Sequence, residues 1–316
     1  MVEHEQQRER TPGRKLFRTP PRSEDAVAAG LFAQIFAGDL ATDAMAALRQ
    51  MYGIDAKDDD ILATHYDVFI HQVPAQGGLY LIAQSDEANR YLRGLSFYLY
   101  RYGIEAPRRD FSADHLTNLL ASTALLWEQD GALGKQFLSQ NVRTWLLPLM
   151  GSLWQHRLGP FKEPLQYYAN WAAGVCRDTP APNLPETKCF DPDAAELETF
   201  KTYLLTPVLS GAFFSHQEIR QWGRVCGFSG SPTPRSQTFT ALLRWAADRD
   251  QVVELLEHIS ASCQAQWQWR EEQPWLQMQF DQAWQNKLQM TQKNLAKMAA
   301  AAGDLFLHAA SETEHS

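Results

Sequence analysis

Residues 112–127 read Ser-Ala-Asp-His-Leu-Thr-Asn-Leu-Leu-Ala-Ser-Thr-Ala-Leu-Leu-Trp, and this stretch decides the class of the fold. Its large apolar side chains return at steps of three or four residues, at Leu116, Leu119, Leu120, Leu126 and Trp127. That spacing gathers them on one side of an α-helix, as a wide stripe that another element must cover. Ser112 precedes the stripe and is predicted to cap the helix.

The same helical period recurs along most of the chain, whereas the alternation typical of strands is nearly absent. Helices are predicted over residues 26–36, 45–51, 61–69, 85–103, 133–153, 165–175, 192–204, 215–225, 239–247, 252–269 and 275–302. Ser215 and Glu218 form a capping box, and Pro148 predicts a kink. The proline and paired glycines of residues 73–78 predict a loop. We therefore expect an all-α helical bundle.

Composition changes divide the predicted bundle into five parts. Residues 1–23 are basic and rich in proline, with few apolar groups, and predict a disordered tail. Residues 24–176 form an N-terminal helical region, and 193–302 a C-terminal one that ends in an extra helix. Four prolines in residues 177–192 predict a linker or hinge between the two regions. Residues 303–316 are predicted to form a C-terminal tail. A mobile hinge permits helix exchange, so both a monomer and a homodimer are compatible with the sequence.

The net charge and the spacing of the cysteines limit the kinds of partner and the cellular compartment that we expect. Lys and Arg number 29 and Asp and Glu 37, a formal charge of −8 that argues against nucleic-acid binding and suits a basic ligand. The four cysteines are widely spaced, without a zinc-binding or redox pattern. We find neither a secretory signal nor about 18 uninterrupted apolar residues, so no membrane insertion is expected. These features predict a cytoplasmic protein.

No catalytic motif stands out, so the sequence predicts neither an enzyme nor a bound metal or cofactor. The run Asp58-Asp59-Asp60 is similar to the magnesium-binding aspartates of all-helical diphosphate enzymes, but it also suits the start of a helix. His65 and His71 lie six residues apart, on different faces of a helix, so we do not expect them to bind one metal ion together. Asp114-His115 opens an apolar helix, where the aspartate suits the helix dipole and the imidazole can bond the backbone.

Several stretches resemble, in order, the TorD/DmsD/NarJ family of chaperones for molybdenum enzymes. Residues 65–81 resemble its aromatic helix end, proline loop and aromatic-Leu pair, and 113–116 its Asp-His motif. Residues 137–148 resemble the family's next helix, which contains a Trp, and residues 167–169 resemble its aromatic pair. Residues 206–215 resemble the segment with Thr-Pro and Ser-Gly that longer members of the family have. The chain departs from the family at Ala75, where a second proline is common, and at Asn141, where many members have His.

The resemblance implies a chaperone that binds the twin-arginine leader or the apoprotein of a molybdenum-containing oxidoreductase before cofactor insertion and export. A groove of apolar side chains beside carboxylates would suit such a leader, which has a basic end and an apolar stretch. The peptide-binding residues carried over from the family are Tyr66, Phe69, Pro74, Tyr80, Asp114 and His115. Trp127 and Trp145 are added from their helical stripes, with burial in the core as the competing interpretation.

Two other functions are compatible with the sequence. One is a helical assembly scaffold that binds a mature subunit independently of any leader, which is what a resemblance to NarJ-like members implies. The other is an all-helical, magnesium-dependent enzyme that processes a diphosphate and uses Asp58, Asp59 and Asp60.

Overall fold

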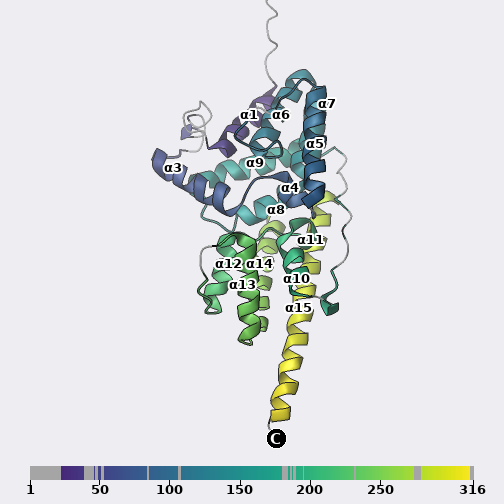
Figure 1. Ribbon diagram of the computed structural model, residues 1–316. Coiled ribbons are helices and arrows are strands. Elements are labelled where there is room, and N and C mark those ends of the chain that lie inside the picture. Colours follow the sequence, from purple (N-terminus) through teal and green to yellow (C-terminus); the bar gives the residue numbers. More distant parts are fainter. Residues whose placement is uncertain are drawn as a thin grey trace, which may run out of the picture.

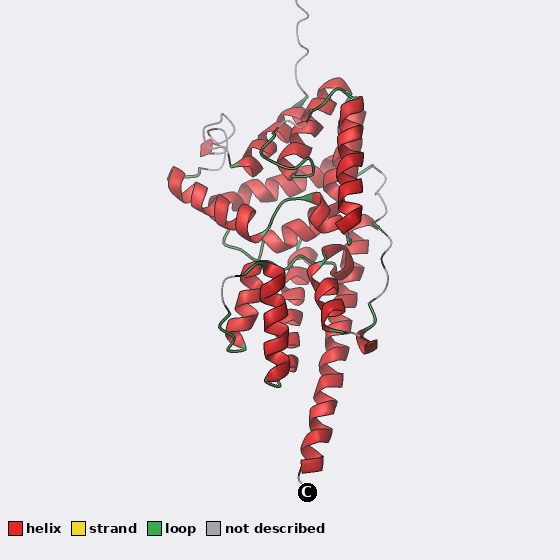
Figure 2. Cartoon of the chain, in the orientation of Figure 1, coloured by secondary structure: helices red, strands yellow, loops and turns green. Residues whose placement is uncertain are grey.

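The computed structural model confirms the all-α prediction. It describes residues 23–38, 46, 49–50, 53–83, 85–105, 108–179, 184–185, 187, 190–194, 196–230, 233–273 and 279–313. Over these residues every regular element is a helix, as Figure 2 shows, and extended backbone pairs at one isolated bridge between Gln76 and His115. None of the described helices has the length and apolar character needed to cross a bilayer.

The first helices form the upper part of the molecule in Figure 1. They are α1 (Glu24–Ala37), α3 (Asp58–His65), the π-helix η1 (Tyr66–Gln72), α4 (Gly77–Leu81), α5 (Ser85–Arg101), α6 (Leu116–Gln129), α7 (Gly131–Leu138), the π-helix η2 (Ser139–Arg143), α8 (Thr144–Leu153), the 3-10 turn η3 (Gly159–Phe161) and α9 (Lys162–Val175). They surround a core that is rich in aromatic side chains, in which Trp145, Tyr168 and Phe137 are fully buried.

The later helices lie below the first group in Figure 1 and surround a second core. They are the 3-10 turn η4 (Pro192–Ala194), α10 (Leu197–Leu205), α11 (Pro207–Ser210), α12 (His216–Val225), α13 (Arg235–Asp248), α14 (Val252–Glu271) and α15 (Gln279–Thr313). Phe213, Trp269 and Trp284 come from this part of the chain but pack in the first core. The two cores are therefore joined by shared elements as well as by the connecting chain.

The helix α15 runs along both cores and projects beyond them (Figure 1). Trp284 belongs to the first core, whereas Leu288 and Leu295, one and three turns further on, belong to the second. A buried ion pair, with Arg143 Nη2 2.6 Å from Asp281 Oδ2, also joins α15 to η2. The helix ends at Thr313 rather than near Ala302, where the sequence placed its end.

Several predicted boundaries are wrong in detail. Ser112 does not cap α6, because His115 takes that position and its Nδ1 accepts a hydrogen bond from the Thr117 amide, at 3.2 Å. Asp191 caps only the short turn η4, and α10 begins separately at Leu197. The paired glycines of the predicted loop open the short helix α4. The capping box at Ser215 and Glu218 is confirmed.

Pro148 lies inside α8, and the regular α-helix is interrupted upstream of it, where η2 forms. A proline has no N–H for the carbonyl four residues earlier, here that of Thr144. The Trp284 indole N–H donates to this carbonyl instead, at 2.7 Å. The proline therefore leaves the Thr144 carbonyl free to accept a hydrogen bond from Trp284 on α15.

Most of the predicted N-terminal tail, residues 1–22, lies outside the described residues. So do most of the predicted helix over 45–51, much of the linker over 177–192, and residues 314–316. The aspartates of residues 58–60 occupy the first turn of α3, as their dipole interpretation predicts. Arg49 forms an ion pair with Asp58.

Candidate peptide-binding site

The Asp114 side chain fastens the loop over residues 73–78 to the start of α6. Its Oδ2 accepts a hydrogen bond from the Gly78 amide at 2.8 Å, and its Oδ1 accepts one from the Ser112 hydroxyl at 2.7 Å. The backbone adds two bonds, from Gly77 N to Asp114 O at 3.0 Å and from Leu116 N to Ala75 O at 2.8 Å. The carboxylate thus satisfies an amide at the N-terminus of α4, where negative charge is favourable.

The paired glycines allow this loop to approach the core closely. A Cβ at Gly77 would lie 2.8 Å from the Tyr91 hydroxyl and 3.2 Å from Trp145 Nε1. Directly after them, Tyr80 is fully buried and stacks on Trp145, with 5.1 Å between ring centroids. The Trp145 indole N–H donates to the Asn141 carbonyl at 2.6 Å. The loop, α5 and the η2–α8 segment are therefore packed together at this point.

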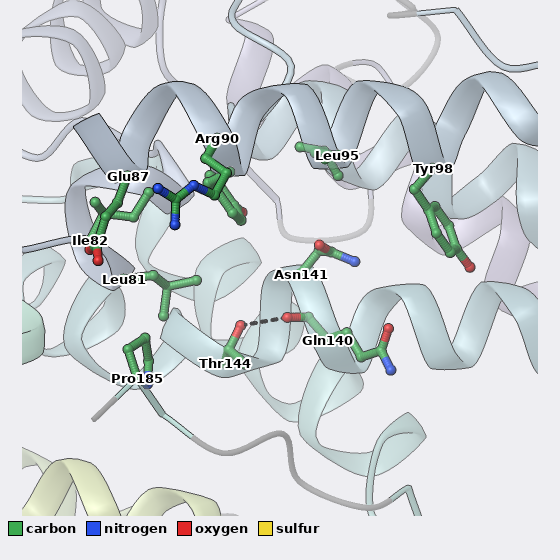
Figure 3. Close-up of a pocket in the computed structure, with 12 residues that line it drawn as sticks. Leu81, Ile82, Glu87, Arg90, Leu95, Tyr98, Gln140, Asn141, Thr144 and Pro185 are labelled. Carbon is green, nitrogen blue, oxygen red and sulfur yellow. Dashed lines mark hydrogen bonds between the residues drawn. The ribbon is translucent and has the colours of Figure 1, made fainter. Parts of the chain in front are cut away.

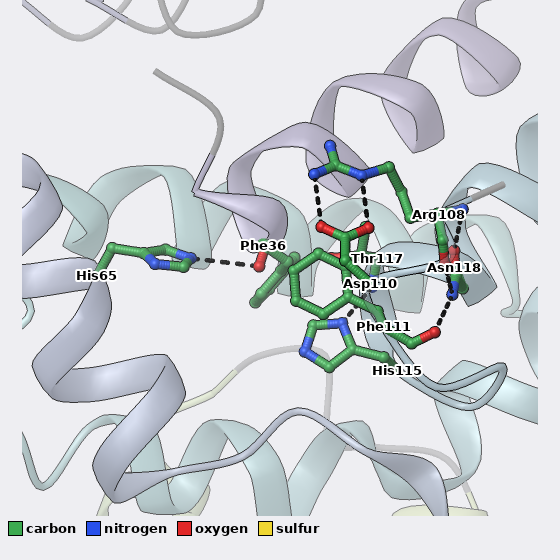
Figure 4. A network of polar contacts seen from close by, with 8 residues as sticks. All are labelled: Phe36, His65, Arg108, Asp110, Phe111, His115, Thr117 and Asn118. Carbon is green, nitrogen blue, oxygen red and sulfur yellow. Dashed lines mark hydrogen bonds and ion pairs between the residues drawn. The ribbon is translucent and has the colours of Figure 1, made fainter. Parts of the chain in front are cut away.

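His115 is a neutral, structural histidine. Desolvation by burial lowers its pKa to about 4, although Asp114 acts in the opposite direction. Its ring stacks on Phe111 at 4.3 Å, beside the loop that Asn118 organises through a hydrogen bond to the Ser112 carbonyl at 3.0 Å. Figure 4 shows this cluster, with His65 bonded separately to the Phe36 carbonyl. An uncharged imidazole here can position the backbone but cannot pair with a carboxylate as a cation.

A pocket of about 570 Å³ lies beside this junction, between α5 and the η2–α8 segment (Figure 3). Its volume is within the usual range for ligand pockets, roughly 300 to 1,000 Å³. The lining residues are Leu81, Ile82, Glu87, Arg90, Tyr91, Gly94, Leu95, Tyr98, Gln140, Asn141, Thr144 and Pro185. Apolar walls with a few polar groups are typical of sites that bury part of a chain and fix its orientation.

The polar groups of the pocket come from two sides. Figure 3 shows Glu87 and Arg90 on α5 at one end, and Gln140 and Asn141 on the opposite segment. The Tyr91 hydroxyl is buried and has no hydrogen-bond partner among the described residues. Burial raises the pKa of Tyr91, and Asp114 raises it further, so the phenol stays protonated and able to donate.

An aromatic pair extends the apolar surface on the solvent side of α5. Phe97 and Tyr100 are 65% and 74% exposed, and their spacing of three residues places them side by side on the helix. Single exposed apolar residues are ordinary, but adjacent large ones favour contact with a partner.

The structure brings together some of the predicted site residues and separates others. Tyr80, Asp114, His115 and Trp145 meet around the loop that contains Pro74, but all except the half-buried Pro74 are buried and contribute to the fold.

The remaining three belong to other surroundings. Phe69 is buried against Phe36 and Phe161, and Trp127 packs on Trp171. Tyr66, on η1, is 55% exposed, so it alone of these three presents much of its side chain to solvent.

Most residues of the pocket lining carry no signal in the sequence. Tyr91, Leu95 and Tyr98 lie on α5 and line the pocket, but none of them belongs to a stretch that resembles the chaperone family. Asn141 was noticed only as a departure from a family pattern. No protein-family model, curated protein or solved structure matches this chain.

Proposed function

We propose that this protein is a chaperone that binds the twin-arginine leader of a molybdenum-containing oxidoreductase, in the pocket between α5 and the η2–α8 segment. The observation that carries the proposal is the amphipathic lining of that pocket, next to the junction where the motifs at Tyr80, Asp114 and Trp145 meet. The protein would act in the cytoplasm, before export, and would perform no reaction on the bound peptide.

The pocket has suitable groups for both parts of a leader. Leu81, Ile82 and Leu95 would cover apolar side chains. Glu87 would attract the basic end, and the net charge of −8 would speed its approach. Arg90 lies beside Glu87 at the same end of the lining, so it would offset part of the attraction between Glu87 and the leader arginines.

A variant that fills the pocket tests whether the leader binds there. Gly94 lies in the lining, and a Cβ there has no neighbour within 4 Å, so Gly94→Phe adds a ring without a clash at its base. Isothermal titration with the leader of a molybdoenzyme encoded nearby should show binding to the wild type. We expect Gly94→Phe to weaken it at least about tenfold, equivalent to roughly 1.4 kcal/mol. Glu87→Gln should weaken it a few-fold and reduce its salt dependence.

Gly174→Phe is the matched control, because Gly174 also lies in a helix, α9, where a Cβ would have no neighbour within 4 Å, and it is absent from the pocket lining. It should bind the leader as the wild type does. Equal binding by both glycine variants would place the peptide elsewhere. Capture of a leader-deleted apoprotein, with no heat from the leader itself, would favour the scaffold function over leader binding.

A further inference from the structure

A cysteine, a glutamate and a histidine meet between α12 and α14, away from the pocket. Cys226 directly follows α12, and Glu254 and His258 lie on α14. One ligand atom from each, a thiol sulfur, a carboxylate oxygen and an imidazole nitrogen, lies within 4.8 Å of the other two. His258 Nε2 and Glu254 Oε1 are 3.9 Å apart.

The fold holds the backbone at the three residues in place independently of any ion. Glu254 and His258 are four residues apart, which puts them on one face of α14. Gly227 follows Cys226 with φ +83°, the left-handed conformation that commonly ends a helix and that glycine adopts with least strain. The Trp222 indole N–H, one turn before Cys226, donates to the Ser262 hydroxyl at 2.9 Å and ties α12 to α14.

We propose that Cys226, Glu254 and His258 form a binding site for a divalent transition-metal ion, with zinc the best fit. Thiolate, imidazole and carboxylate are all ligands of zinc, whereas magnesium and calcium select oxygen ligands. Tetrahedral zinc with bonds of about 2.0 to 2.3 Å places its ligand atoms roughly 3.5 Å apart. The observed separations reach that arrangement through small side-chain movements.

The site is open on one side. Cys226 is 4% exposed, whereas the side chains of His258 and Glu254 are 32% and 48% exposed, so an ion would enter from the solvent at the α14 face. On binding, the Cys226 thiol proton leaves to water and the sulfur bonds the ion. Three protein ligands leave a fourth position for water. The bound ion would link the end of α12 to α14 and stabilise the second core.

Cobalt is a direct probe, because a Co²⁺–thiolate bond absorbs in the near ultraviolet. The full chain, stripped with a chelator and dialysed, should develop this absorption on addition of Co²⁺ and lose it as Zn²⁺ displaces the cobalt. We expect His258→Gln and Glu254→Gln to weaken Co²⁺ binding at least about 100-fold, since loss of an outer-shell partner alone costs up to roughly that. Cys226→Ser should abolish the absorption. His71→Gln, an exposed histidine on η1, is the control and should bind as the wild type does.

Absence of the cobalt–thiolate absorption in the wild type would overturn the proposal. So would an absorption that persists in both α14 variants, because another cysteine would then be the ligand. If the buried Cys226→Ser variant fails to fold, the two α14 variants still decide the outcome, since their side chains are partly exposed. Zinc should also raise the unfolding temperature of the wild type and leave that of His258→Gln unchanged.

Discussion

Gly211 is a residue at which the fold permits no side chain. It ends α11 with φ +81°, and a Cβ there would lie 2.4 Å from the Leu288 backbone nitrogen on α15. Its carbonyl accepts a hydrogen bond from the buried Arg270 guanidinium at 2.7 Å. Close contact between two backbones therefore explains the Ser-Gly segment that the sequence resemblance singled out.

Gly211→Ala should lower the free energy of unfolding by more than about 2 kcal/mol, because left-handed backbone alone costs roughly 1 to 2 kcal/mol and the clash adds to it. Urea denaturation would measure the loss. Gly174→Ala, with open space around its Cβ, should instead leave the stability unchanged or raise it slightly. Similar stabilities for the two variants would contradict the role given to Gly211.

Glu218 is a second residue with a specific consequence, here for pH dependence. Burial raises its pKa from 4.5 to about 7, although the hydrogen bonds of the capping box and Arg235 act in the opposite direction. Between those two pH values the folded chain holds a proton that the unfolded chain releases, so stability falls as pH rises. The contribution of Glu218 to the free energy of unfolding is fully present below about pH 4.5 and is lost as the pH rises through about 7. It amounts to at most about 3 kcal/mol.

Glu218→Gln should reduce the pH dependence of the stability, because the amide does not titrate. The variant should keep the helix cap, since its amide oxygen can still accept a hydrogen bond from the Ser215 N–H, which in the wild type lies 2.7 Å from the carboxylate. Denaturation at several pH values between 5 and 8 would show a smaller slope for the variant than for the wild type. Glu257→Gln changes an exposed carboxylate and should retain the wild-type slope. A slope that survives in Glu218→Gln would assign the titration to another group.

At the scale of elements, the junction of α4 with α6 depends on Asp114. Asp114→Ala leaves the Gly78 amide and the Ser112 hydroxyl without their acceptor, which should cost about 1 to 3 kcal/mol. Ser112→Ala removes one bond to the same carboxylate and should cost less, about 1 kcal/mol. Hydrogen exchange should increase over residues 75–81 in Asp114→Ala before it increases in α6.

The position of Asp114 changes the interpretation of its effect on binding. The family resemblance predicts that Asp114 contacts the peptide, but the carboxylate is buried and already bonded within the protein. We therefore expect any loss of binding to follow from movement of α4, whose Leu81 lines the pocket. Unchanged exchange in 75–81 together with weaker binding would instead indicate direct contact with the peptide.

At the scale of the whole molecule, α15 holds the two cores together. The Arg143–Asp281 pair is almost completely buried, and its carboxylate lies on α15. Asp281→Ala would leave a buried guanidinium without this carboxylate, at a cost of about 3 to 5 kcal/mol. Replacing both partners, as Arg143→Met with Asp281→Leu, should recover most of that loss, since apolar groups of similar size can fill such a site.

Chemical denaturation of the single and double variants would test this coupling. The single variant should also unfold less cooperatively, because the first core would lose an attachment to α15 while the second keeps Leu288 and Leu295. A double variant as unstable as Asp281→Ala would show that side-chain shape, rather than loss of the carboxylate opposite Arg143, dominates at this position.

The sequence by itself determined the helices of this protein, because hydrophobic period and capping are local. Leu116 to Trp127 predicted α6, and Ser215 with Glu218 predicted the start of α12, since their hydrogen bonds span only three residues. The kink predicted at Pro148 shows the limit of local rules. The π-helix lies upstream of the proline, and the carbonyl that the proline leaves free accepts a hydrogen bond from Trp284, far along the chain.

Only the tertiary structure decided what these helices build. The bond from Gly78 to Asp114 crosses 36 residues, and the pocket lies between α5 and the η2–α8 segment. Cys226 likewise meets His258 only where α12 packs on α14. Such contacts depend on how buried surfaces fit together, and a residue's position in a helical stripe does not reveal which distant side chain it will meet.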